Sequence, residues 1–107
     1  MKKYPLEGLK VVDFSWIFTG PIVTKYLGDH GAEIIKIESS ARPDGTRLMT
    51  PFAGGQMGMN TSGVYANYNS SKYSMNLNLR EPRAAEIVKK LVAPSGFSQL
   101  ASTPEPR

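Results

Sequence analysis

Two short apolar runs, separated by a segment with helical periodicity, constrain the fold more than any other feature of the sequence. Residues Leu9–Phe14 and Ile34–Glu38 are rich in β-branched residues, as buried strands are. Gly20-Pro21 suits the first turn of a helix, the apolar residues after it recur at helical spacing, and Gly31 fits a left-handed cap just after the expected helix end near residues 29–30. The sequence therefore predicts a β-α-β unit with parallel strands. The turn after Phe14 then lies at the carboxyl edge of the sheet, where such sheets bind ligands.

A third strand and a second helix are expected further along the chain. Apolar and polar residues alternate in Tyr73–Leu79, and Glu81-Pro82 precedes an amphipathic stretch that reaches Val92. Residues 39–69 show no periodicity, and a loop of this length in a small domain is more often functional than idle. These elements predict an α/β fold: a Rossmann-like, mostly parallel sheet with flanking helices.

The pattern ends after Ala93. Residues 94–107 contain three prolines and no β-branched aliphatic residue, so we expect an irregular tail. A helix that packs on a sheet is usually followed by another strand, and none is predicted here. The expected organisation is therefore a partial domain over residues 1–93 and a tail over 94–107, with an incomplete sheet.

Composition excludes several kinds of site. The 107 residues include no cysteine, which removes disulfides, thiol nucleophiles and thiolate metal sites and suits a reducing cytoplasm. We expect no metal site, because no cluster of metal-ligating residues is present. No stretch approaches the roughly 20 apolar residues of a membrane span, so no membrane partner is expected. The net charge of +4 suits a phosphorylated ligand as easily as a nucleic acid.

Individual polar residues favour structural roles over catalytic ones. Asp13 ends the first strand, and we expect its carboxylate to accept hydrogen bonds from the turn rather than to act as a catalytic acid. His30 is expected to cap the first helix. Gly54-Gly55 follows no predicted strand and is interpreted as a flexible loop, and no phosphate-binding glycine motif is present. No catalytic residue is identified.

Several linked blocks resemble a known family. They are Pro5–Ser15, Gly20-Pro21, Leu27–Glu38, Arg42–Arg47 and Asn69–Leu79. In this order they are similar to the amino-terminal segment of the class III CoA-transferases, a family that includes carnitine, formyl and succinyl CoA-transferases and the alpha-methylacyl-CoA racemases. The resemblance implies a CoA-binding domain, with coenzyme A or an acyl-CoA as the ligand, and a homo-oligomer, since the family forms interlocked dimers.

The resemblance also implies a set of CoA-binding residues. The turn before the first helix lies along the CoA in this family. Lys72 begins the third expected strand at the edge of the sheet, where we expect it to be exposed, and it matches the lysine that reaches the cofactor. Two positions depart from the pattern, because Tyr73 and Ser39 stand where members of the family have arginine. The expected CoA-binding residues are Trp16, Ile17, Phe18, Thr19, Lys72, Arg42 and Arg47.

Three functions remain open at this point. The family's catalytic aspartate lies beyond the matching segment, so the first is a truncated CoA-recognition segment of a class III CoA-transferase that does not transfer CoA alone. The second is a non-catalytic chain that associates with itself or with a complete family member through an uncovered sheet edge. The third is a nucleotide-binding module unrelated to CoA, which the missing phosphate-loop glycines disfavour. No nucleic acid partner is expected.

Overall fold

The structure is a computed structural model that describes residues 3–92 and 96–100 of the chain. Its strands are β1 (Lys10–Asp13), β2 (Glu33–Glu38), β3 (Tyr73–Asn76) and β4 (Gly96–Leu100). Its α-helices are α1 (Thr19–Asp29), α2 (Gly63–Tyr68) and α3 (Ala84–Val92), and two short 3-10 helices, η1 (Gly45–Leu48) and η2 (Ala53–Gly55), precede α2.

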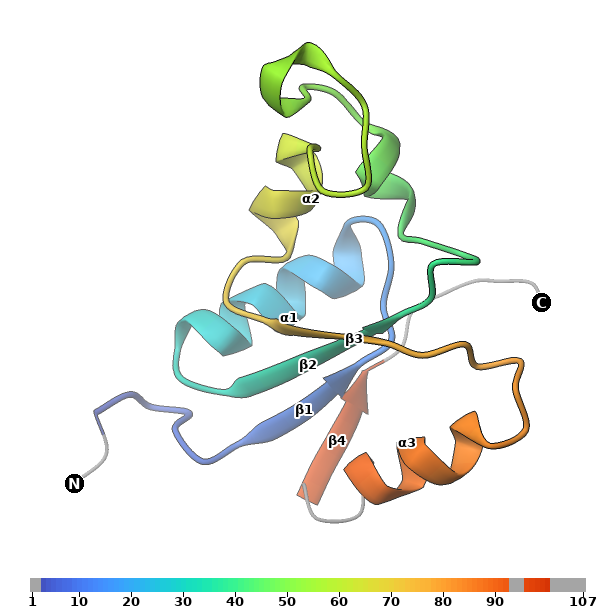
Figure 1. Cartoon of the computed structure of the whole chain (residues 1–107). Coiled ribbons are helices and arrows are strands. Elements are labelled where there is room, and N and C mark those ends of the chain that lie inside the picture. Colours follow the sequence, from blue (N-terminus) through green and yellow to red (C-terminus); the bar gives the residue numbers. More distant parts are fainter. Residues whose placement is uncertain (1–2, 93–95, 101–107) are drawn as a thin grey trace.

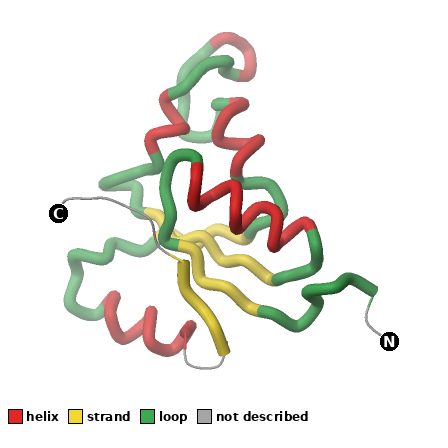
Figure 2. The backbone as a smooth tube through the Cα atoms, turned by 180° about the vertical axis from the view of Figure 1, so that it is seen from behind, coloured by secondary structure: helices red, strands yellow, loops and turns green. Residues whose placement is uncertain are grey.

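The strands form a four-stranded parallel sheet in the order β3-β2-β1-β4. Helices α1 and α3 lie on opposite faces of this sheet, as the two opposed views in Figures 1 and 2 show. The segment from η1 to α2 rises beyond the carboxyl ends of the strands on the side of α1 (Figure 1). The predicted α/β class and the parallel β-α-β unit are confirmed.

The register of β1 and β2 divides the α1 face of the sheet into two halves. Val11 pairs with Ile34, and both are buried in the apolar core with Leu27 of α1 packed against them. Two residues further along the strands, Asp13 pairs with Lys36, and these two side chains are also fully buried. Paired residues of parallel strands point to the same face, so apolar contacts at the amino end give way to charges at the carboxyl end.

The carboxyl end of α1 follows the sequence prediction. The helix ends at Asp29, and His30 caps it: the His30 backbone N–H and ring Nδ1 both contact the carbonyl oxygen of Tyr26. Gly31 adopts φ 111°, a left-handed conformation that favours glycine. The expected roles of His30 and Gly31 in ending the helix are confirmed.

Two segments have more regular structure than the sequence predicted. Gly96–Leu100, expected to be part of an irregular tail, forms β4 and pairs with β1, so the sheet has a strand at the position where none was expected. The remaining tail positions, 94–95 and 101–107, lie outside the described residues. The long loop 39–69 contains η1, η2 and α2, and Ser62 caps α2 by accepting a hydrogen bond from the Tyr65 N–H. None of the helices in the described ranges is long and apolar enough to cross a membrane.

Candidate functional site

A buried ion pair joins β2 to the loop that follows it. Lys36 Nζ lies 2.9 Å from Asp44 Oδ2, and the two side chains are 1% and 0% exposed. The same ammonium group donates to the backbone oxygen of Ser15 at 2.8 Å. Asp44 Oδ1 also accepts hydrogen bonds from the backbone N–H and the hydroxyl of Thr46. The loop is therefore fixed over the carboxyl ends of the strands by a fully buried pair of charges.

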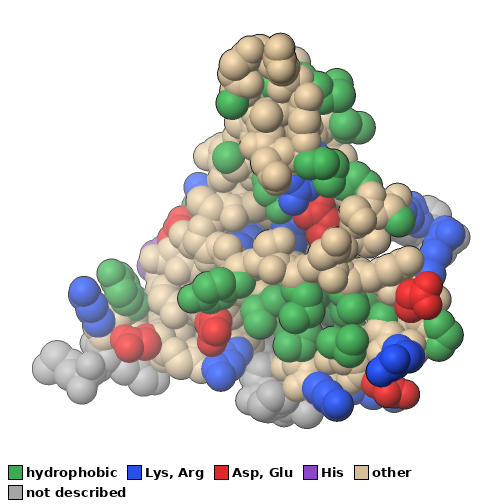
Figure 3. All heavy atoms as spheres, in the orientation of Figure 1, with side chains coloured by type: hydrophobic (Ala, Val, Ile, Leu, Met, Phe, Trp, Pro, Cys, Tyr) green, Lys and Arg blue, Asp and Glu red, His purple; other side chains and the backbone are tan. Residues whose placement is uncertain are grey.

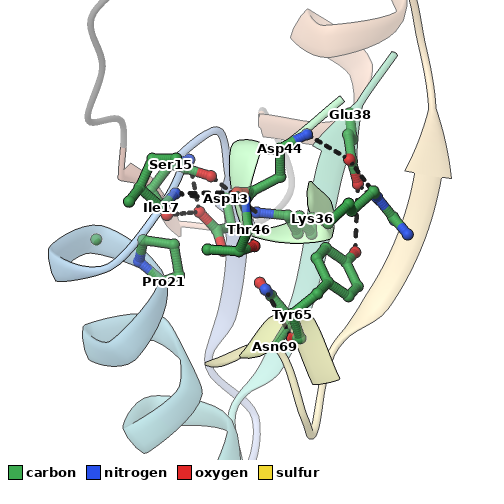
Figure 4. Close-up of polar contacts among 12 residues, drawn as sticks. Asp13, Ser15, Ile17, Pro21, Lys36, Glu38, Asp44, Thr46, Tyr65 and Asn69 are labelled. Atoms are coloured by element: carbon green, nitrogen blue, oxygen red, sulfur yellow. Dashed lines mark hydrogen bonds and ion pairs between the residues drawn. The ribbon is translucent and has the colours of Figure 1, made fainter. Parts of the chain in front are cut away.

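This ion pair also holds the turn between β1 and α1. Ile17 N donates to both carboxylate oxygens of Asp44, at 3.2 and 3.4 Å, while Lys36 binds the carbonyl of Ser15 two residues earlier. Figure 4 shows the Asp44 carboxylate between the turn and Lys36. The Asp44 carboxylate thus fixes the N–H of Ile17, and the Lys36 ammonium group fixes the carbonyl of Ser15 in the same turn.

Asp13 fixes the start of the same turn. Its Oδ1 accepts hydrogen bonds from the backbone N–H of Ser15 at 2.7 Å and from the Ser15 hydroxyl. Its Oδ2 accepts from Thr24 Oγ1 of α1 at 2.8 Å and from Lys72 Nζ at 3.0 Å. The prediction that Asp13 holds the turn by accepting backbone hydrogen bonds is confirmed.

A third carboxylate is paired with Arg47. Arg47 donates to Glu38 through Nε at 2.6 Å and through a second guanidinium nitrogen at 2.8 Å, a two-point contact. The guanidinium lies 3.7 Å from the centre of the Tyr65 ring, and the Tyr65 hydroxyl donates to Glu38 at 3.2 Å. Glu38 also accepts from the backbone N–H of Asp44 at 2.7 Å. This pair ties η1 and α2 to the end of β2.

The charges in this region balance. The cluster contains three carboxylates and three cations, each buried or nearly so, and we call it the charge network: Asp13, Glu38, Asp44, Lys36, Arg47 and Lys72. Each member has an opposite charge at hydrogen-bond distance. Removal of one member would leave its partner buried and unpaired, which is far more costly than the loss of a surface pair.

The surroundings shift several pKa values in this network. Burial alone would raise the pKa of Glu38 and of Asp44, but Arg47 and Lys36 respectively, together with backbone N–H groups, more than offset this, and both pKa values lie below their ordinary range. Burial lowers the pKa of Lys72, which Asp13 opposes. Burial and the Glu38 carboxylate raise the pKa of Tyr65.

Two of the predicted binding residues belong to this network. Lys72 was expected at the exposed start of a strand, and this is wrong: its side chain is 2% exposed. Its three ammonium protons have acceptors in Asp13, the carbonyl of Pro21 and the Asn69 side chain, at 2.8 to 3.1 Å. Arg47 is likewise buried and paired with Glu38. The geometry therefore gives both residues structural partners within the chain.

The other predicted residues lie together at the turn. Trp16 and Ile17 are half-buried, Thr19 is exposed, and Phe18 packs on the Tyr68 ring with 5.1 Å between the ring centres. The Arg42 guanidinium lies 5.5 Å from the centre of the Trp16 ring. The loop after β2 thus brings a cation to the side of the turn, at the carboxyl edge of the sheet.

A small pocket lies between the charge network and β3. Its volume is about 210 Å³, below the roughly 300 Å³ of a typical pocket for an organic ligand. Its lining residues are Lys36, Arg47, Asn60, Tyr65, Asn69, Lys72, Tyr73 and Ser74. This pocket is therefore too small to enclose a molecule as large as CoA. Within the described residues, no three histidine, cysteine or carboxylate side chains lie together as ligands for a metal ion.

Sequence reasoning missed the roles of Lys36, Glu38 and Asp44. The sequence does contain a sign of buried charges: Lys36 and Glu38 alternate with isoleucines in a run that otherwise indicates a buried strand. Charged residues at alternate positions of a buried strand require buried partners. Both partners, Asp44 and Arg47, lie in the loop that follows, where the sequence shows no periodicity and where Arg47 was expected to contact a ligand.

Comparison with known proteins decides which family this site belongs to. The family model described as CoA-transferase family III matches residues 6–96, which include the charge network and the turn. The chain belongs to CoA-transferase family III. Within that family, succinyl-CoA:glutarate CoA-transferase from Homo sapiens is 39% identical over 90 residues, a match that covers 83% of this chain and 19% of the human protein.

Two further relatives support the assignment to family III. Succinate–glutarate CoA-transferase from Agrobacterium fabrum is 33% identical over 93 residues, covering 85% of this chain and 23% of the relative. The crystal structure of a CAIB/BAIF family protein from Brucella suis superimposes with a TM-score of 0.76 at 32% identity, covering 92% of this chain and 26% of that one. The chain thus spans about a fifth to a quarter of these relatives.

The burial of Lys72 predicts a large effect on stability. Lys72→Met keeps the length of the side chain but leaves Asp13 without its cation, and we expect the free energy of unfolding to fall by about 3 kcal/mol, the usual cost of breaking a buried pair. Lys89→Met, on an exposed position of α3, is the matched control and should change it by less than about 0.5 kcal/mol. Urea denaturation measures both. Equal stability of the two variants would contradict the burial of Lys72.

The lowered pKa values of Glu38 and Asp44 predict acid sensitivity. Both groups release protons more readily in the folded chain, so their contribution is complete above their ordinary pKa values of 4.5 and 3.8 and is lost as the pH falls through the lower folded values. We expect the free energy of unfolding to fall below about pH 4.5. Glu38→Gln should flatten this dependence, whereas Glu86→Gln, on an exposed position of α3, should not. Urea titrations between pH 3 and 6 measure the slopes, and equal slopes in the two variants would rule out the role of Glu38.

Proposed function

We propose that this chain recognises coenzyme A or an acyl-CoA thioester at the carboxyl edge of its sheet, along the turn Trp16–Thr19. It does so as part of an enzyme that transfers CoA between an acyl-CoA and a carboxylic acid. The observation that carries the proposal is the match to CoA-transferase family III over residues 6–96, which contain the whole of this turn and the charge network that holds it.

The start of α1 supplies favourable electrostatics for the phosphates of CoA. No side chain caps this helix at Phe18, and its first turn contains no acidic residue. The free N–H groups and the positive end of the helix dipole favour an anion at this position. Arg42 adds a cation beside Trp16. Backbone donors and one arginine therefore surround the proposed path of the ligand.

The charge network has a different part in the proposal. Lys72 and Arg47 act by holding the elements around the turn, since their hydrogen bonds are made within the chain. Direct phosphate contacts are assigned to the turn and to Arg42. The absence of cysteine from the 107 residues supports a cytoplasmic location.

Binding of CoA to the chain tests the proposal. We expect calorimetric titration with CoA to show binding that is tighter than binding of ADP, because ADP lacks the pantetheine arm. Arg42→Gln should weaken CoA binding about five- to tenfold at low salt and less at physiological salt, where the Debye length is about 8 Å. Arg80→Gln is the matched control for the loss of one positive charge, since Arg80 is exposed, follows β3 and belongs neither to the turn nor to the loop after β2.

Two results would overturn this proposal. If CoA does not bind at all, the recognition site is absent from this chain. If ADP binds as tightly as CoA and the affinity is the same in Arg42→Gln and Arg80→Gln, the site is a general nucleotide site elsewhere on the molecule.

A second candidate function is self-association through the face that carries α3. β3 lies at one edge of the sheet. Large apolar side chains in and after this strand are exposed: Tyr73 by 66%, Leu79 by 54% and Ile87 by 41%. Figure 3 shows hydrophobic side chains gathered over the region between β3 and α3. We propose that a second copy of the chain covers this surface, since an unpaired strand edge beside apolar side chains favours association.

Sedimentation velocity tests this second proposal. We expect the chain to sediment as a concentration-dependent dimer or larger species, and Tyr73→Glu to shift it towards monomer by placing a charge in the apolar surface. Tyr26→Glu is the control, because Tyr26 is 55% exposed but belongs to α1 on the opposite face. A wild-type monomer at high concentration, or the same shift in both variants, would reject association through this face.

A further inference from the structure

Ile17 has a backbone conformation that its side chain disfavours. Its φ is 71°, in the left-handed region, and the described residues contain only one other non-glycine residue with positive φ, Ser71. A β-branched residue in this region is an outlier, because its Cβ substituents crowd the neighbouring backbone. Such strain persists only where the surroundings hold it in place, and it gathers at functional sites.

Asp44 is the group that holds Ile17. Both of its carboxylate oxygens accept a hydrogen bond from the Ile17 N–H, at 3.2 and 3.4 Å, although the two residues are 27 positions apart in the sequence. Asp44 is fully buried, and its place is fixed in turn by Lys36 and by the N–H and hydroxyl of Thr46. The carboxylate is therefore a rigid acceptor for the N–H of the strained residue.

Gly45 makes room for the side chain of the same residue. A Cβ atom on Gly45 would lie 2.8 Å from Ile17 Cδ1, so the flexible end of the isoleucine side chain would have to shift. Asp44 thus fixes the backbone of Ile17, and the next residue lies against its side chain.

We propose that Asp44 is a positioning residue for CoA recognition: its carboxylate keeps Ile17 left-handed, which sets the path of Trp16–Thr19 and presents the turn backbone and the start of α1 to the ligand. This rests on the proposed function, in which CoA lies along this turn. Lys36 completes the arrangement, because it pairs with Asp44 and binds the carbonyl of Ser15.

A double-mutant cycle separates positioning from general stability. Asp44→Asn keeps the size of the side chain and an acceptor oxygen but removes the charge. With Ile at position 17 we expect it to weaken CoA binding about tenfold, because the left-handed conformation is then held less firmly. In the Ile17→Gly background we expect a loss of only about twofold, since glycine adopts this conformation without strain. Calorimetry at one salt concentration measures all four affinities.

Matched controls keep the cycle interpretable. Asp29→Asn alters a carboxylate at the other end of α1, where it accepts from Ser71 Oγ at 2.6 Å, and should leave CoA affinity unchanged. The free energy of unfolding of each variant, from urea denaturation, shows that it is folded at the temperature of the titration. A purely structural role for Asp44 predicts the same fold-loss of affinity whether residue 17 is isoleucine or glycine, and that result would overturn the proposal.

Hydrogen exchange in the absence of ligand tests the positioning role independently. In the free chain, exchange followed by NMR should show the Ile17 amide accelerated by Asp44→Asn at least tenfold more than the amide of Ile34, in the core of β2, which reports the loss of global stability. Equal acceleration at the two amides would overturn the positioning role even if CoA binds. If the wild type does not bind CoA but the Ile17 amide responds as expected, the proposed function fails while Asp44 is still shown to set the turn.

Discussion

The buried pair of Lys36 and Asp44 is the interaction on which the arrangement of the sheet edge depends. Lys36 comes from the middle of β2, which cannot move without disrupting the sheet, and Asp44 comes from a loop with little regular structure of its own. Their attraction places the loop over the strand ends. The backbone groups of Ser15 and Ile17 then take their positions from the two charged side chains. One ion pair therefore determines the geometry of both the loop and the turn.

The α1 face combines two kinds of stabilisation in one layer. At the amino end of the strands, Val11 and Ile34 pack with apolar partners, and this burial supplies non-directional stability. At the carboxyl end, hydrogen-bonded charges supply direction and fixed distances instead. A buried ion pair often adds little net stability compared with an apolar contact, so its contribution here is mainly specificity of position. That division suits the proposed recognition of a ligand at the carboxyl edge of the sheet.

Local pattern was sufficient to predict the elements nearest to the core. β1, α1, β2 and α3 were predicted within a few residues of their observed bounds, because their hydrophobic periodicity and their helix-ending residues are encoded locally. The role of Asp13 could be predicted for the same reason, since the backbone donor that it binds lies in the next turn.

The partnership of Asp44 with Ile17 could not be predicted, because nothing in the residues around position 44 specifies a contact at position 17. The exposed position expected for Lys72 was wrong because two of its acceptors, Asp13 and the carbonyl of Pro21, lie 59 and 51 positions earlier in the chain.

The contact between Asp44 and Ile17 has a consequence for the order in which the site is made. During synthesis, β1 and the start of α1 leave the ribosome well before residue 44 does, and 27 positions separate the turn from the carboxylate that shapes it. Until that residue arrives, the left-handed conformation of Ile17 has no acceptor to stabilise it. The nascent β1–α1 unit can therefore be helical before its turn has its final shape. In the proposed function, recognition of CoA begins only when the loop after β2 has docked.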